Sequence, residues 1–76
     1  MSIARERLVE QLIVTAGFRP SLVGIGRDDD RPWATFRSGS EYVRLVGDGL
    51  SDDAAAADIV RQARENGIVS KLIHIE

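Results

Sequence analysis

The spacing of apolar residues changes twice along this chain, from helical to alternating and back to helical. Residues 3–16 and 52–65 place apolar side chains three and four positions apart, which predicts an amphipathic helix at each place. Residues 21–27, 33–38 and 41–46 have the composition and alternation of short strands. Because helices at both ends of an antiparallel meander can pack on one face of its sheet, this order predicts an α+β two-layer sandwich with the elements α-β-β-β-α.

The first predicted helix is expected to begin after Ser2 and to end at Gly17. Glycine can adopt the left-handed conformation there, and Phe18 can then fold back onto the last turn. The apolar face of this helix is predicted from helical spacing to contain Leu8, Val9, Leu12, Ile13 and Ala16.

Glycines punctuate the predicted strands. Gly39 lies in an SGS stretch and is free to adopt positive φ, which is typical of a tight hairpin. In the first strand, Val23 and Ile25 are expected on one face, while Gly24 and Gly26 weaken the strand and can mark a bulge.

The second predicted helix begins at a strong capping residue, Ser51. Asp52 and Asp53 follow in its first turn, where each negative charge stabilises the helix dipole by roughly 0.3–1 kcal/mol. Asn66 and Gly67 are expected to end the helix. Its buried stripe is predicted to contain Ala56, Ile59, Val60 and Ala63.

The C-terminal residues 71–76, KLIHIE, alternate over a short stretch and are expected to form a final strand. This strand could complete the sheet, or it could pair with its copy in a second chain by strand addition. A homodimer formed through the C-terminal strand is therefore one predicted assembly.

The composition argues against several classes of protein. The 76 residues fit a single domain, 1–76, and their formal net charge of −2 is unlike that of a phosphate-driven nucleic-acid binder. The chain has no cysteine and one histidine, so neither a metal site nor a cofactor is expected. No apolar stretch is long enough to span a membrane, and the charged N-terminus is unlike a signal peptide, so the cytoplasm is the expected location.

Catalysis has little support in the sequence. His74 has no serine, cysteine or paired acid at a useful spacing, so a catalytic dyad is not predicted. Gly24 and Gly26 lack the third glycine and the following helix of a dinucleotide-binding loop. Consecutive carboxylates at residues 28–30 do not match the alternate spacing of calcium ligands. The protein is therefore expected not to be an enzyme.

The approach to the second helix resembles that of double-stranded-RNA-binding domains. Gly47, Gly49 and Ser51 form a Gly-x-Gly-x-Ser entry that leads into an alanine-rich helix. The resemblance covers roughly residues 3–67 and rests mainly on the order of the elements. It implies a fold that holds duplex RNA through the first helix, through the loop between the first two strands and through lysines at the start of the last helix.

The residues at these contact regions do not fit duplex RNA. Asp28, Asp29 and Asp30 lie in the loop between the first two strands, and Asp52 and Asp53 stand where the family places lysines. These carboxylates would repel a phosphate backbone. The resemblance therefore predicts the fold, while the residues argue against duplex RNA as the ligand.

One face of the predicted sheet carries residue types that are common in interfaces. If Phe36 faces the helices, alternation places Trp33, Arg37, Tyr42 and Arg44 on the other face. These types are over-represented at interface hot spots, and they can also stack bases. Two structural alternatives stay open: Trp33 and Tyr42 can form a cross-strand pair that only stabilises the sheet, or the C-terminal tail can lie over them.

Two functional hypotheses follow. In the first, the protein is an acidic, non-enzymatic binding module whose aspartates mimic phosphates and block a basic, nucleic-acid-binding surface on a partner protein. Small phage-encoded inhibitors, including anti-CRISPR proteins, provide the analogy. In the second, the protein is a degenerate nucleic-acid binder that uses the sheet face. The acidic candidates are Asp28, Asp29, Asp30, Asp52 and Asp53, and the sheet-face candidates are Trp33, Arg37, Tyr42 and Arg44.

Overall fold

The structure is a computed structural model that describes residues 5–49 and 51–68. It contains two α-helices and three strands: α1 (Arg5–Ile13), β1 (Leu22–Asp28), β2 (Arg31–Ser38), β3 (Glu41–Val46) and α2 (Asp52–Glu65). A π-helical turn, Val14–Phe18, and a short 3₁₀ helix, Arg19–Ser21, connect α1 to β1. This order confirms the predicted α+β class. The predicted C-terminal strand lies outside the described residues. The homodimer expected from this strand, and the alternative in which the C-terminal tail lies over Trp33 and Tyr42, therefore stay predictions.

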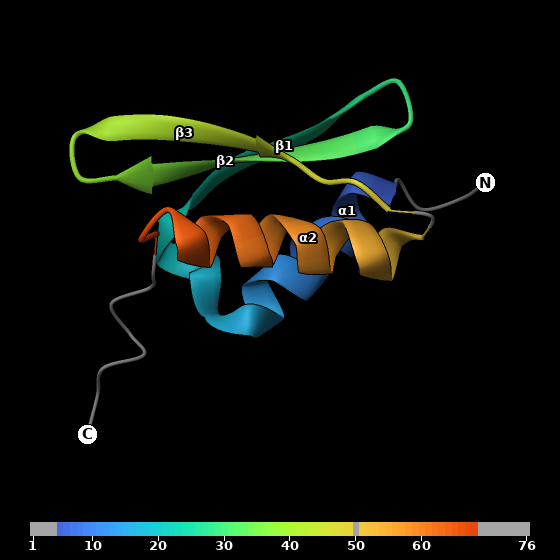
Figure 1. The fold of residues 1–76 in the computed structure, drawn as a ribbon, viewed down its shortest axis with the longest axis horizontal. Coiled ribbons are helices and arrows are strands. Elements are labelled where there is room, and N and C mark those ends of the chain that lie inside the picture. The colour runs from blue at the N-terminus through green and yellow to red at the C-terminus, as the bar shows by residue number, and fades with distance from the viewer. Residues whose placement is uncertain (1–4, 50, 69–76) are drawn as a thin grey trace.

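The sheet forms one layer and the two helices form the other (Figure 1). The strands are antiparallel neighbours in the order β1-β2-β3. α1 contacts β1 and β2, whereas α2 contacts β2 and β3, and the helices also pack against each other. Both helices lie on the same side of the sheet, so no described helix covers its other side (Figure 1).

The core lies between these two layers. Ala34 and Phe36 of β2 are fully buried, and the Phe36 ring meets the Phe18 ring edge-on with 5.7 Å between the centroids. Leu45 is buried beside them and Val43 packs against the same cluster, as the alternation along β3 predicts. The buried residues of α2 are Ala55, Ala56, Ile59 and Ala63.

The first helix ends at Gly17, as predicted, but its last turn is wider than an α-helical turn. α1 ends at Ile13 and continues into a π-helical turn, Val14–Phe18, in which Gly17 alone leaves helical φ/ψ. Gly17 has the predicted left-handed conformation, with φ 98°. Glycine suits this position because it has no β-carbon, which would be strained at such an angle. Phe18 is buried after this turn, as predicted.

The buried face of α1 is narrower than predicted, because it does not include Leu8. Val9 and Ile13 are fully buried, and Leu12 and Ala16 pack partly against the core. Leu8 is 44% exposed, so its predicted place in this face is wrong. The reason is geometric: neighbouring helical residues differ by about 100° of rotation, and Val9 already points at the centre of the core.

A bulge changes which residues of β1 share a face. The pairing register shifts between Leu22 and Gly24, which leaves Val23 as the extra residue, 55% exposed. Ile25 pairs with Ala34 and packs against the core. The predicted bulge is confirmed, whereas the expectation that Val23 and Ile25 share a face is wrong because the extra residue interrupts the alternation.

The residues that the sequence predicts form the hairpin turn between β2 and β3 and the two ends of α2. Gly39 connects β2 to β3 with a positive φ of 66°. The Oγ atom of Ser51 accepts a hydrogen bond from the backbone N–H of Ala54 at 3.1 Å, which confirms the predicted N-cap. Gly67 follows α2 with a positive φ of 75°, which is typical of the end of a helix.

A hydrogen-bond network around Asp58 ties α2 to the end of the sheet. The Asp58 carboxylate accepts hydrogen bonds from the Asp48 backbone N–H at 3.0 Å and from Gln62 Nε2 at 2.9 Å. Gln62 Nε2 also donates to the Val46 carbonyl at 2.9 Å. The hydrogen bond from the Arg61 guanidinium is the main reason that the pKa of Asp58 lies below its usual value.

Candidate functional site

The side of the sheet that faces away from the helices is the candidate binding surface, and we call it the open sheet face. Side chains of a strand alternate between its two sides, so this face receives every second residue of β2 and β3 and the matching residues of β1. The register places Gly24, Gly26, Asp28, Arg31, Trp33, Thr35, Arg37, Tyr42, Arg44 and Val46 on it. The bulged residue Val23 has no partner in the register, and we count it with this face because it follows the core-packed Leu22 and is 55% exposed.

The four sheet-face candidates predicted from the sequence all lie on this surface. The register pairs Arg37 with Tyr42, and it pairs Trp33 with Val46. The expectation that Trp33 and Tyr42 form a cross-strand pair is therefore wrong, because Tyr42 lies beside the far end of β2. The aromatic side chains instead occupy different rows of the sheet.

Two neighbours hold the Trp33 ring in place. Gly26, its partner on β1, has no side chain, and a β-carbon there would lie 2.8 Å from the Cε2 atom of the indole and closer still to Cζ2. The ring therefore rests against the glycine backbone. The Arg44 guanidinium lies over the ring at 3.9 Å from its centroid, which is cation–π geometry.

Exposed apolar side chains share this face with the stack. Three of the four large apolar side chains that are exposed in the described part of the chain lie on the open sheet face. They are Tyr42, which is 65% exposed, Val23 at 55% and Val46 at 37%. Because apolar groups gathered on one exposed face often mark an interaction site, this concentration makes the open sheet face a candidate interface.

The open sheet face also differs in charge from the molecule as a whole. It carries Arg31, Arg37 and Arg44 against a single carboxylate, Asp28, while the full chain has a formal net charge of −2. The Arg37 Nε atom donates to the Gly39 carbonyl at 3.3 Å, which directs this side chain toward the β2–β3 turn. The face therefore presents a cationic excess on an acidic protein.

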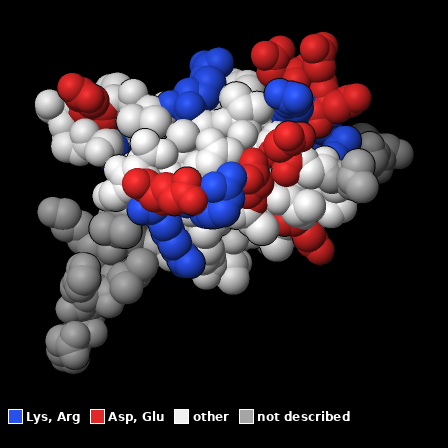
Figure 2. Space-filling view, viewed as in Figure 1, with Lys and Arg blue, Asp and Glu red and all other residues white. Residues whose placement is uncertain are grey.

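Asp28, Asp29 and Asp30 form an acidic turn between β1 and β2, at one end of the sheet. Figure 2 shows carboxylates gathered around the β1–β2 turn. Asp29 has a positive φ of 59°, and its carbonyl accepts a hydrogen bond from Arg27 Nη2 at 3.0 Å. Asp30 projects from the turn with a side chain that is 99% exposed, 3.6 Å from the same guanidinium. This acidic turn borders the open sheet face at Asp28.

The two aspartates at the start of α2 do not form a second patch of the same kind. Asp52 makes an ion pair with Arg5 at 2.7 Å, and its side chain is only 17% exposed. Asp53 is exposed. Asp52 is therefore engaged more closely than Asp30, whose fully exposed side chain lies 3.6 Å from the Arg27 guanidinium.

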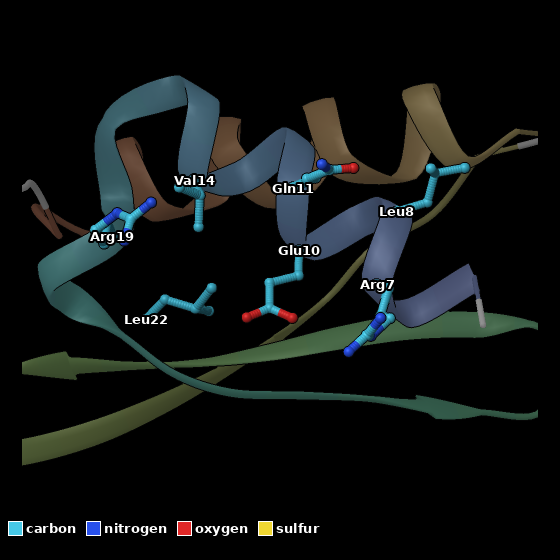
Figure 3. A pocket seen from close by; sticks show the side chains of 7 residues that line it. All are labelled: Arg7, Leu8, Glu10, Gln11, Val14, Arg19 and Leu22. Atoms are coloured by element: carbon cyan, nitrogen blue, oxygen red, sulfur yellow. The ribbon is translucent and has the colours of Figure 1, made fainter. Parts of the chain in front are cut away.

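A groove of about 570 Å³ lies between α1 and the start of β1 (Figure 3). In Figure 3, Glu10 points from α1 toward β1, with Leu22 on one side and Arg7 on the other. Charges of both signs line this groove, and among the described residues no stacking contact fixes them. The lining residues are Arg7, Leu8, Glu10, Gln11, Val14, Arg19 and Leu22.

Neither a metal centre nor a membrane-spanning helix is present among the described residues. Within residues 5–49 and 51–68, no three acidic or histidine side chains converge as metal ligands would. In the same ranges, no helix has the length and apolar character needed to cross a bilayer.

The comparison with known proteins found no relative of this chain. No protein-family model, no curated protein and no solved structure matches the chain. The resemblance to double-stranded-RNA-binding domains therefore stays a prediction, and the candidate site depends on the geometry of the open sheet face.

Sequence reasoning missed several parts of this surface. Val46 and Arg31 follow from the same alternation that places Trp33 outside, so the pattern could have found them. Val23 could not be placed because the bulge shifts the register. The support of Trp33 by Gly26 depends on pairing between strands, and the only local signal is a glycine in a strand.

Proposed function

We propose that this protein is a small, non-enzymatic protein-binding module whose interface is the open sheet face. The observation that carries the proposal is the Arg44 guanidinium held over Trp33 among exposed apolar side chains. Buried tryptophan, tyrosine and arginine anchors supply most of the energy in many protein interfaces. An arginine that is already ordered loses less side-chain entropy when it binds.

Two features favour a protein partner over a nucleic acid. Single-strand-binding surfaces offer free aromatic rings to successive bases, but Arg44 already lies over the Trp33 ring. The acidic turn at residues 28–30 borders the face and would repel a phosphate chain that ran along the strands. Tyr42 is the aromatic side chain that stays largely free.

The acidic turn supports a narrower form of the proposal. Asp30 projects fully into solvent and Asp28 and Asp29 lie beside it, so a partner could place a basic patch against this end of the module. Such a module could block a nucleic-acid-binding surface, as the phage-type, anti-CRISPR-like hypothesis states. Asp53 could extend the contact, whereas Asp52 contributes less because Arg5 neutralises it.

Site-specific photo-crosslinking in cells of the source organism tests the proposal. A photoreactive phenylalanine derivative replaces Tyr42 on the open sheet face in one variant and Leu8 beside the groove in a matched control, since both side chains are exposed. We expect protein adducts from position 42 that disappear when Arg44→Ala is added, and none from position 8. Adducts only from position 8, or nucleic-acid adducts from position 42, would contradict the proposal.

A further inference from the structure

We infer that the open sheet face recognises a carboxylate of its protein partner through Arg44, with apolar groups of the partner on either side. This inference rests on the proposed function and names the chemistry of the partner. Three features support it: the fixed guanidinium, the apolar neighbours on β3 and the distribution of charge.

The Arg44 guanidinium is fixed in place and its hydrogen-bond donors are free. Trp33 supports the planar group from one side at 3.9 Å, while the N–H donors of a guanidinium lie in its plane. Within the described residues, no hydrogen bond or ion pair engages Arg44. A guanidinium in this state matches the two oxygens of a carboxylate and can bind them in parallel.

Gly26 is a positioning residue for this arrangement. The Trp33 ring occupies the space that any side chain at position 26 would need. A larger residue there must displace the ring and with it the support of Arg44. Gly24 lies on the same strand and the same side, and a β-carbon there would meet no neighbouring atom within 4 Å, so it offers a matched control.

The neighbours of Arg44 define the rest of the ligand. Tyr42 and Val46 lie two residues before and after it on β3, and both are exposed. Residues two apart in a strand lie about 7 Å from each other on one face. The complementary partner therefore carries an acidic side chain with an apolar group at about that distance on each side.

A second copy of this chain is a poor occupant. Arg44 lies over Trp33 near the middle of the open sheet face, so stacking two such faces about a two-fold axis would bring like charges together. Like charges in contact oppose association. The charge distribution thus favours a different protein that places an acidic side chain against Arg44.

Peptide selection followed by titration tests the inference. A phage-displayed library of random linear peptides is selected on the immobilised protein, and recovered peptides are synthesised without tryptophan. Because Trp33 is the only tryptophan in the chain, its fluorescence reports directly on binding at the Arg44 stack. The variants are Arg44→Ala, Arg44→Lys, Gly26→Ala, Gly24→Ala, Tyr42→Thr and, on the helical layer, Arg7→Ala.

The expected result is a set of peptides that share an acidic residue between apolar ones and that alter Trp33 fluorescence. Arg44→Ala should weaken their binding by about tenfold or more, the size of a hot-spot loss. Arg44→Lys should also weaken it, since an ammonium group keeps the charge but lacks the planar pair of donors. Gly26→Ala should reduce binding more than Gly24→Ala does, while Arg7→Ala, on the helical layer, should leave it unchanged.

Other outcomes overturn the inference in distinguishable ways. If binding survives Arg44→Ala but falls with Tyr42→Thr, the carboxylate contact is wrong while the open sheet face remains the interface. If no open-face substitution affects any selected peptide, the proposed function fails as well. Selection of peptides that lack an acidic residue but still need Arg44 for binding, or tighter binding of short dT or rU oligonucleotides to the same face, would also overturn the inference.

Discussion

The two sides of the sheet are built from the same three strands and have opposite properties. On the side that faces the helices, Ala34 and Phe36 are fully buried in a cluster that includes residues of both helices. On the open sheet face, Tyr42 is 65% exposed and the main contact is the stack of Arg44 on Trp33. The difference indicates that the side facing the helices provides most of the stability of this small domain, which leaves the open sheet face available to bind a partner.

The largest effect is expected on the covered side. Phe36→Ala removes a fully buried ring that meets Phe18 edge-on, so it should lower the free energy of unfolding by about 3–5 kcal/mol. In so small a domain this loss should unfold a large part of the population. Urea denaturation followed by circular dichroism measures it, and a loss under about 1 kcal/mol would contradict the assigned core.

Gly26→Ala tests the close packing of β1 against the Trp33 ring on the open sheet face. The new methyl group collides with the Trp33 ring, so we expect a loss of about 1–3 kcal/mol in the free energy of unfolding. Trp33 fluorescence should shift toward that of a solvated indole. The matched change Gly24→Ala should have neither effect, since the space beside Gly24 is empty. Equal behaviour of the two variants would exclude the stack.

The Asp58 network makes the joint between sheet and α2 sensitive to pH. The pKa of Asp58 is lowered in the folded protein, mainly by the hydrogen bond from Arg61, so its stabilising contribution is present above the usual aspartate pKa and is lost as pH falls through the lower, folded value. Asp58→Asn should cost about 1–2 kcal/mol at neutral pH and should flatten the acid limb of the stability curve. An unchanged acid limb in denaturation series at several pH values would contradict this.

The smallest effect is expected for the exposed aromatic side chain. Tyr42→Thr keeps a residue type that suits strands and removes little buried area, so the free energy of unfolding should change by no more than about 0.5 kcal/mol. The same urea titration measures it beside Phe36→Ala. A loss as large as that of a core residue would show that the open sheet face is covered and stabilising.

Periodicity predicted the parts of this molecule that depend on neighbours in sequence. Alternation along β2 and β3 placed Phe36 inside and Trp33 outside, and the capping role of Ser51 followed from its side chain. The parts that were missed depend on contacts between distant residues. Asp52 pairs with Arg5, which lies 47 positions away, and no local pattern reveals that its charge is neutralised.

The same limit applies to the details of the first helix and the first strand. Leu8 has the spacing of a core residue, but only the packing of α1 against α2 and the sheet decides which stripe is buried. Gly24 indicated a bulge, but the position of the register shift fixes the side on which Val23 lies. The Trp33 stack combines residues of all three strands, so it emerges only with the register known.

Chemical-shift mapping of backbone amides tests directly whether the partner binds the open sheet face. A ¹⁵N-labelled sample is titrated with a partner identified by crosslinking or with a selected acidic peptide. We predict that the largest shifts fall on the open sheet face, at Gly26, Trp33, Tyr42, Arg44 and Val46, while the amides of Leu8 and Arg19 at the groove stay unchanged. The largest shifts at the groove, with the amides of β3 unchanged, would show that the open sheet face is not the interface.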